Sequence, residues 1–149
     1  MTTKDEVPAL FSVGHEGRSQ DELVAQVREH RVTVLLDVRL NAISRKPGFS
    51  KTRLAQSLSE ARIAYRHARA LGNPADNREP FRSGDREEGL RVYRDLLLSD
   101  GARAELQNLA ELLTTERVAV LCFERDEHRC HRQAVVAAVS DRVPVVRLN

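Results

Sequence analysis

The sequence is poor in several residue types, and each scarcity excludes a class of protein. It has no tryptophan, one methionine and two cysteines among 149 residues. Two cysteines cannot form the disulfide framework that small secreted domains need. No apolar run approaches the roughly 20 residues that span a bilayer, and the first residues lack the basic and then apolar order of a signal peptide. We therefore expect a single domain over residues 1–149, in the cytoplasm and without a membrane partner.

Lysine is also scarce, since 21 of the 24 basic residues are arginine. The planar guanidinium group suits phosphate and carboxylate. Residues 37–69 carry eight basic and two acidic residues, a net charge of +6, whereas the rest of the chain carries 16 basic and 20 acidic residues, a net charge of −4. A genome rich in G and C would explain the excess of arginine, but it would not explain this clustering. The segment therefore indicates a nucleic acid or nucleotide as a partner; oligomeric state is not indicated.

The hydrophobic pattern alternates between strand-like and helix-like segments. Ser19 and Glu22 predict a capping box for the first helix, and Ser50 is the expected cap of the second. Strands are predicted at 7–13, 33–38, 63–66, 118–122 and 143–148, and helices at 20–30, 50–61, 87–98, 102–113 and 130–139. The alternation predicts an α/β fold of three layers, with a mainly parallel five-stranded sheet, helices on both faces and the strand order 3-2-1-4-5. The intervening loop, residues 68–86, is too long to be a simple connection.

Polar side chains follow three of the predicted strands where each strand ends. Gly14 and His15 end the first, Asp37 and Arg39 the second, and Cys122 with Glu124 the fourth. Ligands of open parallel sheets bind at the carboxyl ends of the strands. These residues are therefore expected to meet in one site.

Four potentially reactive residues cluster after the fourth strand: Cys122, Glu124, Cys130 and His131. They could hold a metal, but their spacing matches no standard zinc site, so a metal is not favoured. Cys130, at a helix start beside Arg132, could instead be a nucleophile or redox thiol. Cys122 could have that role too, or be a small buried apolar residue. Glu124 and His131 are acid–base candidates, and Arg132 is a candidate for binding an anion.

Other candidates have both structural and functional interpretations. Asp37 could be a general acid or base, or it could pair with an arginine such as Arg39. His15 could shuttle a proton or only form a hydrogen bond at the helix start. Phe49 could stack on a base, or it could fold back as an apolar lid. The candidate phosphate-binding cations near it are Arg39, Arg45, Lys46 and Arg53.

Together these motifs resemble the domain of unknown function 488 family. The resemblance rests on Ser12-Val13-Gly14-His15, Leu36-Asp37-Val38-Arg39, Ser44-Arg45-Lys46-Pro47-Gly48-Phe49, Tyr65-Arg66-His67, Leu71-Gly72-Asn73-Pro74, and Cys122-Phe123-Glu124 with Cys130-His131-Arg132. It implies an α/β fold and a site built from these motifs, with Asn73 among its binding residues. It implies no activity.

The sequence as a whole predicts an enzyme that acts on a phosphate-bearing substrate, a nucleic acid or a nucleotide, with no cofactor identified. One alternative is a non-enzymatic accessory domain that binds nucleic acid through the same basic surface. The other is a thiol or metal redox protein.

Overall fold

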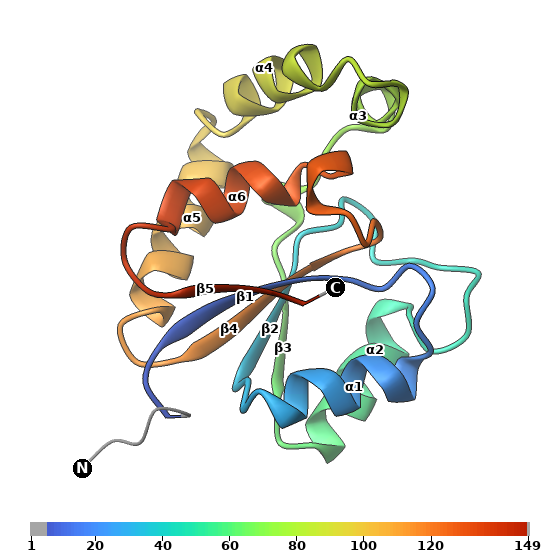
Figure 1. Ribbon diagram of the computed structural model, residues 1–149, viewed down its shortest axis with the longest axis vertical. Helices are drawn as coiled ribbons and strands as arrows, with labels where there is room; N and C mark the ends of the chain where they lie inside the picture. The colour runs from blue at the N-terminus through green and yellow to red at the C-terminus, as the bar shows by residue number, and fades with distance from the viewer. Residues whose placement is uncertain (1–5, 149) are drawn as a thin grey trace.

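The computed structural model describes residues 6–148, which form a five-stranded sheet between two layers of helices (Figure 1). The strands are β1 (Ala9–Gly14), β2 (Val34–Asp37), β3 (Ala64–His67), β4 (Arg117–Cys122) and β5 (Val145–Leu148). All neighbouring strands are parallel. The predicted α/β class with helices on both faces is confirmed.

The strand order is β3-β2-β4-β1-β5, so the predicted order 3-2-1-4-5 is wrong in one exchange. β4, and not β1, lies beside β2, where Leu121 pairs with Asp37, and Cys122 at its end pairs with Gly14 of β1. All residues of β1, β2 and β4 are buried, so the apolar pattern suits each of them equally for the centre. The ends of these three strands still lie side by side, with β4 in the middle.

Helices cover both faces of the sheet. α1 (Gln20–Glu29) and α2 (Lys51–Glu60) lie on one face, and α5 (Asp100–Leu112) and α6 (Arg132–Val139) lie on the other (Figure 1). The alternation within strands separates two cores, because side chains of successive residues point to opposite faces. Leu10 and Leu36 therefore belong to the core under α5 and α6, and their neighbours Phe11 and Leu35 belong to the core under α1 and α2.

The two predicted helix caps have different outcomes. Ser19 forms the full capping box, in which its Oγ accepts from the backbone N of Glu22 at 3.1 Å and its own backbone N donates to Glu22 Oε1 at 3.0 Å. Ser50 precedes α2, but its hydroxyl does not cap that helix. It instead bonds to both the backbone N and the backbone O of Ser44, each at 3.1 Å. This serine therefore braces the loop before α2.

The segment predicted as a long loop is partly helical. Two short 3₁₀ turns, at Arg69–Leu71 and Ala75–Asn77, lead into α3 (Glu79–Ser83) and α4 (Arg86–Leu96). α4 packs against α6, and α3 packs against a third 3₁₀ turn at Glu127–Arg129 that precedes α6. The segment thereby reaches the carboxyl edge of the sheet. Within residues 6–148, no helix is long and apolar enough to cross a membrane.

Candidate functional site

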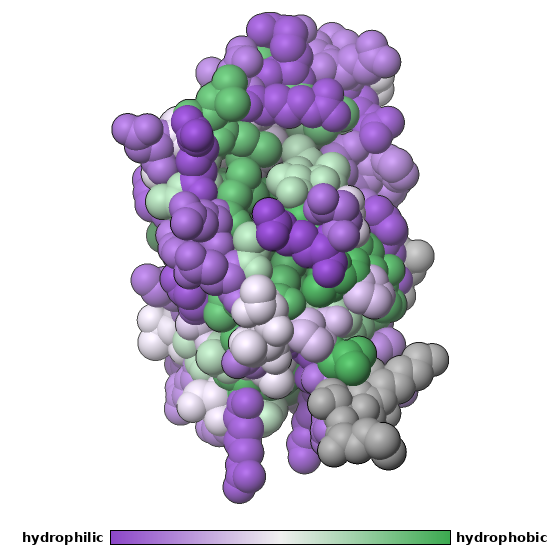
Figure 2. Space-filling view, turned by 90° about the vertical axis from the view of Figure 1, so that its left-hand side faces the viewer, coloured by the Kyte–Doolittle hydropathy of each residue, from purple (hydrophilic) through white to green (hydrophobic). Residues whose placement is uncertain are grey.

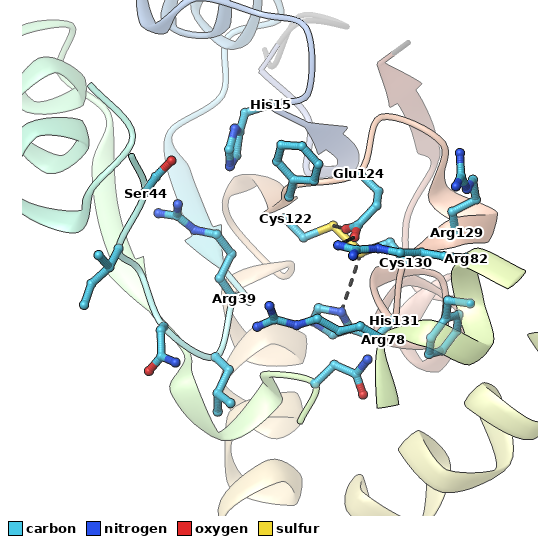
Figure 3. A pocket seen from close by; sticks show the side chains of 16 residues that line it. His15, Arg39, Ser44, Arg78, Arg82, Cys122, Glu124, Arg129, Cys130 and His131 are labelled. Atoms are coloured by element: carbon cyan, nitrogen blue, oxygen red, sulfur yellow. Dashed lines mark hydrogen bonds and ion pairs between the residues drawn. A yellow bond between two sulfur atoms is a disulfide. The ribbon is translucent and has the colours of Figure 1, made fainter. Parts of the chain in front are cut away.

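A pocket of about 200 Å³ opens at the carboxyl edge of the sheet, where the polar strand ends meet (Figure 3). His15 follows β1, Arg39 follows β2, and Cys122 and Glu124 come from β4 and the residues after it. The crossover helix after β2 lies on one face and the helix after β4 on the other, which is the arrangement that leaves a crevice between strand ends. The pocket therefore occupies the place expected for a ligand site in this type of sheet.

Positive charge dominates the pocket wall. Four arginines line the pocket, namely Arg39, Arg78, Arg82 and Arg129. Among the described lining residues, Glu124 is the acidic one, and its Oε1 lies 3.4 Å from Nη2 of Arg82. The Arg82 side chain is nearly half exposed, at 47%, so this ion pair is weak and can open. The pocket is suited to a ligand with more than one negative charge.

Asp37 is wholly buried and bound to Arg39, as the structural interpretation required. Arg39 donates to its carboxylate from Nε at 2.8 Å and from Nη2 at 2.6 Å, and the Tyr65 hydroxyl donates to Oδ2 at 2.6 Å. Burial, together with the charge of Asp37, raises the pKa of Tyr65, so the phenol stays a donor. Asp37 does not line the pocket, and its contacts make it a positioning residue for the Arg39 guanidinium.

His15 lines the pocket although only 2% of its surface is exposed. Its Nδ1 is buried and has no hydrogen-bond partner among the described residues. Burial, followed by the positive charges of Arg39 and Lys46, lowers the pKa of His15 from 6.5 to about 4. The ring is therefore neutral at pH 7 and keeps a free lone pair.

Aromatic rings hold His15 in place. It stacks on Phe49 with ring centroids 4.4 Å apart, and it meets the edge of Phe123 at 5.2 Å. Phe49 itself is completely buried, so the structure places it as an apolar lid and not as a ring available to a base. Lys46 donates from Nζ to the backbone O of His15 at 2.5 Å, which holds the loop before α2 against the end of β1.

The two cysteines are joined as a disulfide, which lies in the pocket wall beside the Glu124 carboxylate (Figure 3). Atoms of Cys122, Glu124 and Cys130 that could ligate a metal lie within 4.8 Å of one another. Disulfide sulfurs are not thiolates, however, and thiolates are what a metal binds. The bonded pair thus argues against the metal site considered from the sequence, and His131 is not part of that group.

Arg132 lies behind the disulfide and is 1% exposed. Its Nη1 donates to Cys122 Sγ at 2.6 Å, its Nε donates to Ser12 Oγ at 2.7 Å, and its backbone N donates to Cys130 Sγ at 3.3 Å. Burial lowers the pKa of Arg132 to about 10, so the side chain is still a cation at pH 7. Arg132 does not line the pocket, and its contacts are with the protein.

His131 lines the pocket and its tautomer is set by the fold. Its Nε2 lies 2.8 Å from the backbone O of Val38, which can only accept, so Nε2 carries the proton. Nδ1 is then an acceptor, and it lies 3.6 Å from Cys130 Sγ. Burial is the main cause that lowers the pKa of His131 to about 4, so this imidazole is also neutral at pH 7.

The remaining predicted residues are divided between the pocket and other surfaces. Asn73 lines the pocket, but its amide is bonded to Asn77 through both Nδ2 and Oδ1. Arg45 is exposed on the loop and does not line the pocket. Arg53 lines a separate hollow beside Gln20 of α1. Of the cations in the basic segment, Arg39 lines the pocket, and Lys46 lies behind His15.

Several pocket residues were not found from the sequence. Arg78 and Arg82 come from the segment 68–86, for which only the unusual length indicated a functional role. Their four-residue spacing places them about one helical turn apart. Two apolar side chains also line the pocket and are exposed, Ile43 at 82% and Phe123 at 42%. For Phe123, the available signal was an aromatic residue between the end of a buried strand and the charged residues Glu124 and Arg125.

Figure 2 shows one face of the molecule, on which hydrophilic side chains border a band of apolar ones. Scattered apolar surface of this kind is normal in globular proteins. The apolar residues at the pocket are distinguished by their position beside arginines and not by their exposure alone.

Comparison with known proteins gives one match. No curated protein and no solved structure matches the chain. The model of a family described as a domain of unknown function, DUF488, matches residues 19–139, which include β2, β4, the disulfide and α6. His15 lies before the matched range, so the family match does not cover the β1 end of the pocket. With most of its length matched, the chain belongs to the DUF488 family.

Proposed function

We propose that the protein is an enzyme acting on a phosphate-bearing substrate, with a nucleic acid or a nucleotide as the substrate class. The observation that carries this proposal is the convergence of Arg39, Arg78, Arg82 and Arg129 on one pocket in which Glu124 supplies the negative charge. A guanidinium group can donate two parallel hydrogen bonds to two oxygens of one phosphate, with a fixed geometry. Asp37 supports the proposal because it orients Arg39 without facing the ligand.

The acid–base groups of the proposed reaction are His15 and Glu124. A neutral imidazole can take a proton from a water or hydroxyl nucleophile, and a carboxylate can do the same or return the proton to a leaving group. Glu124 becomes available when the substrate phosphate competes for Arg82, its ion-pair partner. His131 is less suited to this task, because its Nδ1 faces Cys130 and its Nε2 is bonded to Val38.

The apolar residues at the pocket favour a nucleic acid or nucleotide over inorganic phosphate. Phe123 offers an exposed ring to stack on a base, and Ile43 lies exposed in the same pocket lining. The same two residues also suit the second candidate function, an accessory domain that binds nucleic acid and catalyses nothing. The two functions differ in turnover and not in binding.

Binding is tested with fluorescent single- and double-stranded oligonucleotides and with nucleotides, each titrated at several salt concentrations. For nucleic acid, log affinity should fall linearly with log salt, because binding releases counterions. The double variant Arg78→Ala/Arg82→Ala should lose about tenfold or more in affinity, since each contact is a charge-assisted hydrogen bond. The matched control, Arg94→Ala/Arg103→Ala, removes two exposed arginines of α4 and α5 and should bind normally. Equal losses in both variants, or no binding by the wild type, would overturn the substrate class.

Turnover is tested on a panel of phosphomonoesters, phosphodiesters and nucleotides with the wild type, Glu124→Gln and His15→Asn. The proposed enzyme should convert one member, and both variants should bind it while losing most of kcat. Wild-type protein that binds a substrate but converts none would instead support the accessory domain.

A further inference from the structure

We propose that Cys122 and Cys130 form a reversible thiol–disulfide couple that a small dithiol reduces through the pocket, with attack on Cys130 and departure of Cys122. Both sulfurs belong to residues that line the pocket. The cysteines are otherwise enclosed, with 1% and 2% of their surfaces exposed. A molecule that fits a cavity of about 200 Å³ can therefore reach the bond, whereas a protein surface cannot.

The two sulfurs have different partners, and the difference decides which one leaves. Cys122 Sγ accepts a hydrogen bond from the Arg132 guanidinium at 2.6 Å. Thiol–disulfide exchange is faster when the departing sulfur is stable as a thiolate, and a hydrogen-bonded cation supplies that stability. The Glu124 carboxylate opposes it from 3.7 Å, but the cation is nearer and is held by three further acceptors: Ser12 Oγ and the backbone oxygens of Glu124 and Arg125.

Cys130 has less support for a negative charge, because the donor to its Sγ is the neutral backbone N of Arg132 at 3.3 Å and not a cation. His131 Nδ1 lies 3.6 Å from its Sγ, and this nitrogen accepts because Nε2 donates to Val38. A thiol at Cys130 can donate its hydrogen to Nδ1. The reduced pair is therefore a thiolate on the Arg132 side and a hydrogen-bonded thiol on the His131 side.

The exchange balances as a two-electron step. A thiolate of the dithiol attacks Cys130 Sγ, the Cys122–Cys130 bond breaks, and its electron pair leaves on Cys122. The second thiolate of the reagent attacks the reagent sulfur of the mixed disulfide, forms the cyclic disulfide of the reagent and releases Cys130. Of the two protons of the dithiol, one ends on Cys130 and one enters the solvent. The reverse reaction consumes a small disulfide.

This redox function is independent of the proposed substrate class, because none of its steps needs a phosphate-bearing ligand. The couple is thus a second activity of the same pocket.

The first experiment measures reversibility on the intact, folded protein. Dithiothreitol should convert the protein from no maleimide-reactive thiols to two without denaturant, and its cyclic disulfide should reverse the change. Circular dichroism should show that the fold persists in both states. Thiols that become reactive only after unfolding, or a pair that never re-forms its bond, would overturn the proposal.

The second experiment identifies the attacked sulfur. Native protein is treated with glutathione, quenched with acid and digested with trypsin, which separates the two cysteines at Arg125 and Arg129. The glutathione adduct should favour Cys130 over Cys122 by about tenfold, the ratio expected from one charge-assisted hydrogen bond to the leaving sulfur. Equal labelling, or an excess on Cys122, would refute the assigned direction.

Single variants give a readout that does not depend on trapping. Cys130→Ser leaves Cys122 beside Arg132, and Cys122→Ser leaves Cys130 beside His131. Thiolate absorbance at 240 nm should persist to more acidic pH in Cys130→Ser than in Cys122→Ser. The opposite order, or coincident titrations, would contradict the role given to Arg132.

Discussion

At the scale of single residues, polar side chains are buried in and behind the pocket. Their burial would cost free energy if the fold did not give each of them suitable surroundings. His15 and His131 are buried imidazoles whose pKa values lie near 4, and in the unfolded chain both return to their ordinary value of about 6.5. Asp37 is a carboxylate without contact with solvent, balanced by Arg39 and Tyr65. These groups connect the stability of the protein to its site.

The two histidines predict acid lability over a defined range. Between pH 6.5 and about 4 the unfolded chain binds protons at both residues while the folded protein does not, so the free energy of unfolding falls as the pH falls. Above pH 6.5 the two histidines do not change the free energy of unfolding with pH, and below about pH 4 their effect levels off. Each residue accounts for about 3 kcal/mol of the loss. Urea denaturation at pH 7, 5.5 and 4.5 measures it, and His15→Gln should show a shallower decline than the wild type.

Replacement of Asp37 by asparagine should be strongly destabilising. The substitution leaves the Arg39 charge buried without its partner, which costs about 3 kcal/mol or more in comparable buried pairs. The matched control is Glu88→Gln, which removes one carboxylate of an exposed pair with Arg91 and should change little. Chemical denaturation compares the two variants. Similar denaturation midpoints for both variants would show that Asp37 does not stabilise the buried charge of Arg39.

At the scale of elements, β4 has the greatest influence on the site. It pairs with β1 and with β2, and the chain beyond it supplies Glu124, the disulfide and α6. Gly14 at the end of β1 permits this, because a Cβ there would overlap the backbone O of Glu124. One position without a side chain thus lets the two strand ends close around the pocket.

Gly14→Ala should therefore destabilise the protein and displace Glu124, through an overlap of the added methyl with the backbone that cannot be relieved by a rotamer change. Gly101→Ala is the control. Gly101 lies in the first turn of α5, and an added Cβ there would contact only the Cβ of Ala70, at 3.4 Å. Alanine is the better helix former, so the control should be neutral or slightly stabilised. Thermal unfolding distinguishes them. An unchanged midpoint for Gly14→Ala would show that the Glu124 backbone moves freely.

At the scale of the whole molecule, the sequence predicts the fold class and one side of the pocket. Alternating periodicities predict the layers, and polar residues after buried strands predict the meeting of His15, Arg39 and Glu124. The strand order was not predictable, because three strands are equally apolar. Arg78 and Arg82 reach the pocket through the packing of α3 on the turn before α6, a contact between distant segments that no local pattern records.

Both cores share one sheet, and this predicts a single cooperative unfolding transition. Tyr93 belongs to the core under α5 and α6, and Tyr65 packs on the core under α1 and α2. Because the chain has no tryptophan, Tyr65→Phe and Tyr93→Phe each leave one fluorescent ring that reports on one core. In each variant, the fluorescence transition and the circular dichroism transition should have the same midpoint. Two separate midpoints within one variant would show that the cores unfold independently.

The central position of β4 also matters during synthesis of the chain. The strand at the middle of the sheet is the fourth to be made, and about 80 residues separate the end of β2 from its start. At translation speeds of about 5–20 residues per second, the ribosome needs roughly 4–16 s to make that stretch. β1 and β2 share no ladder, so their buried edges wait for β4 throughout that time. On the nascent chain, the apolar edges of β1 and β2 that face β4 therefore stay unpaired until the strand between them emerges, and we expect them to be prone to aggregation in that interval.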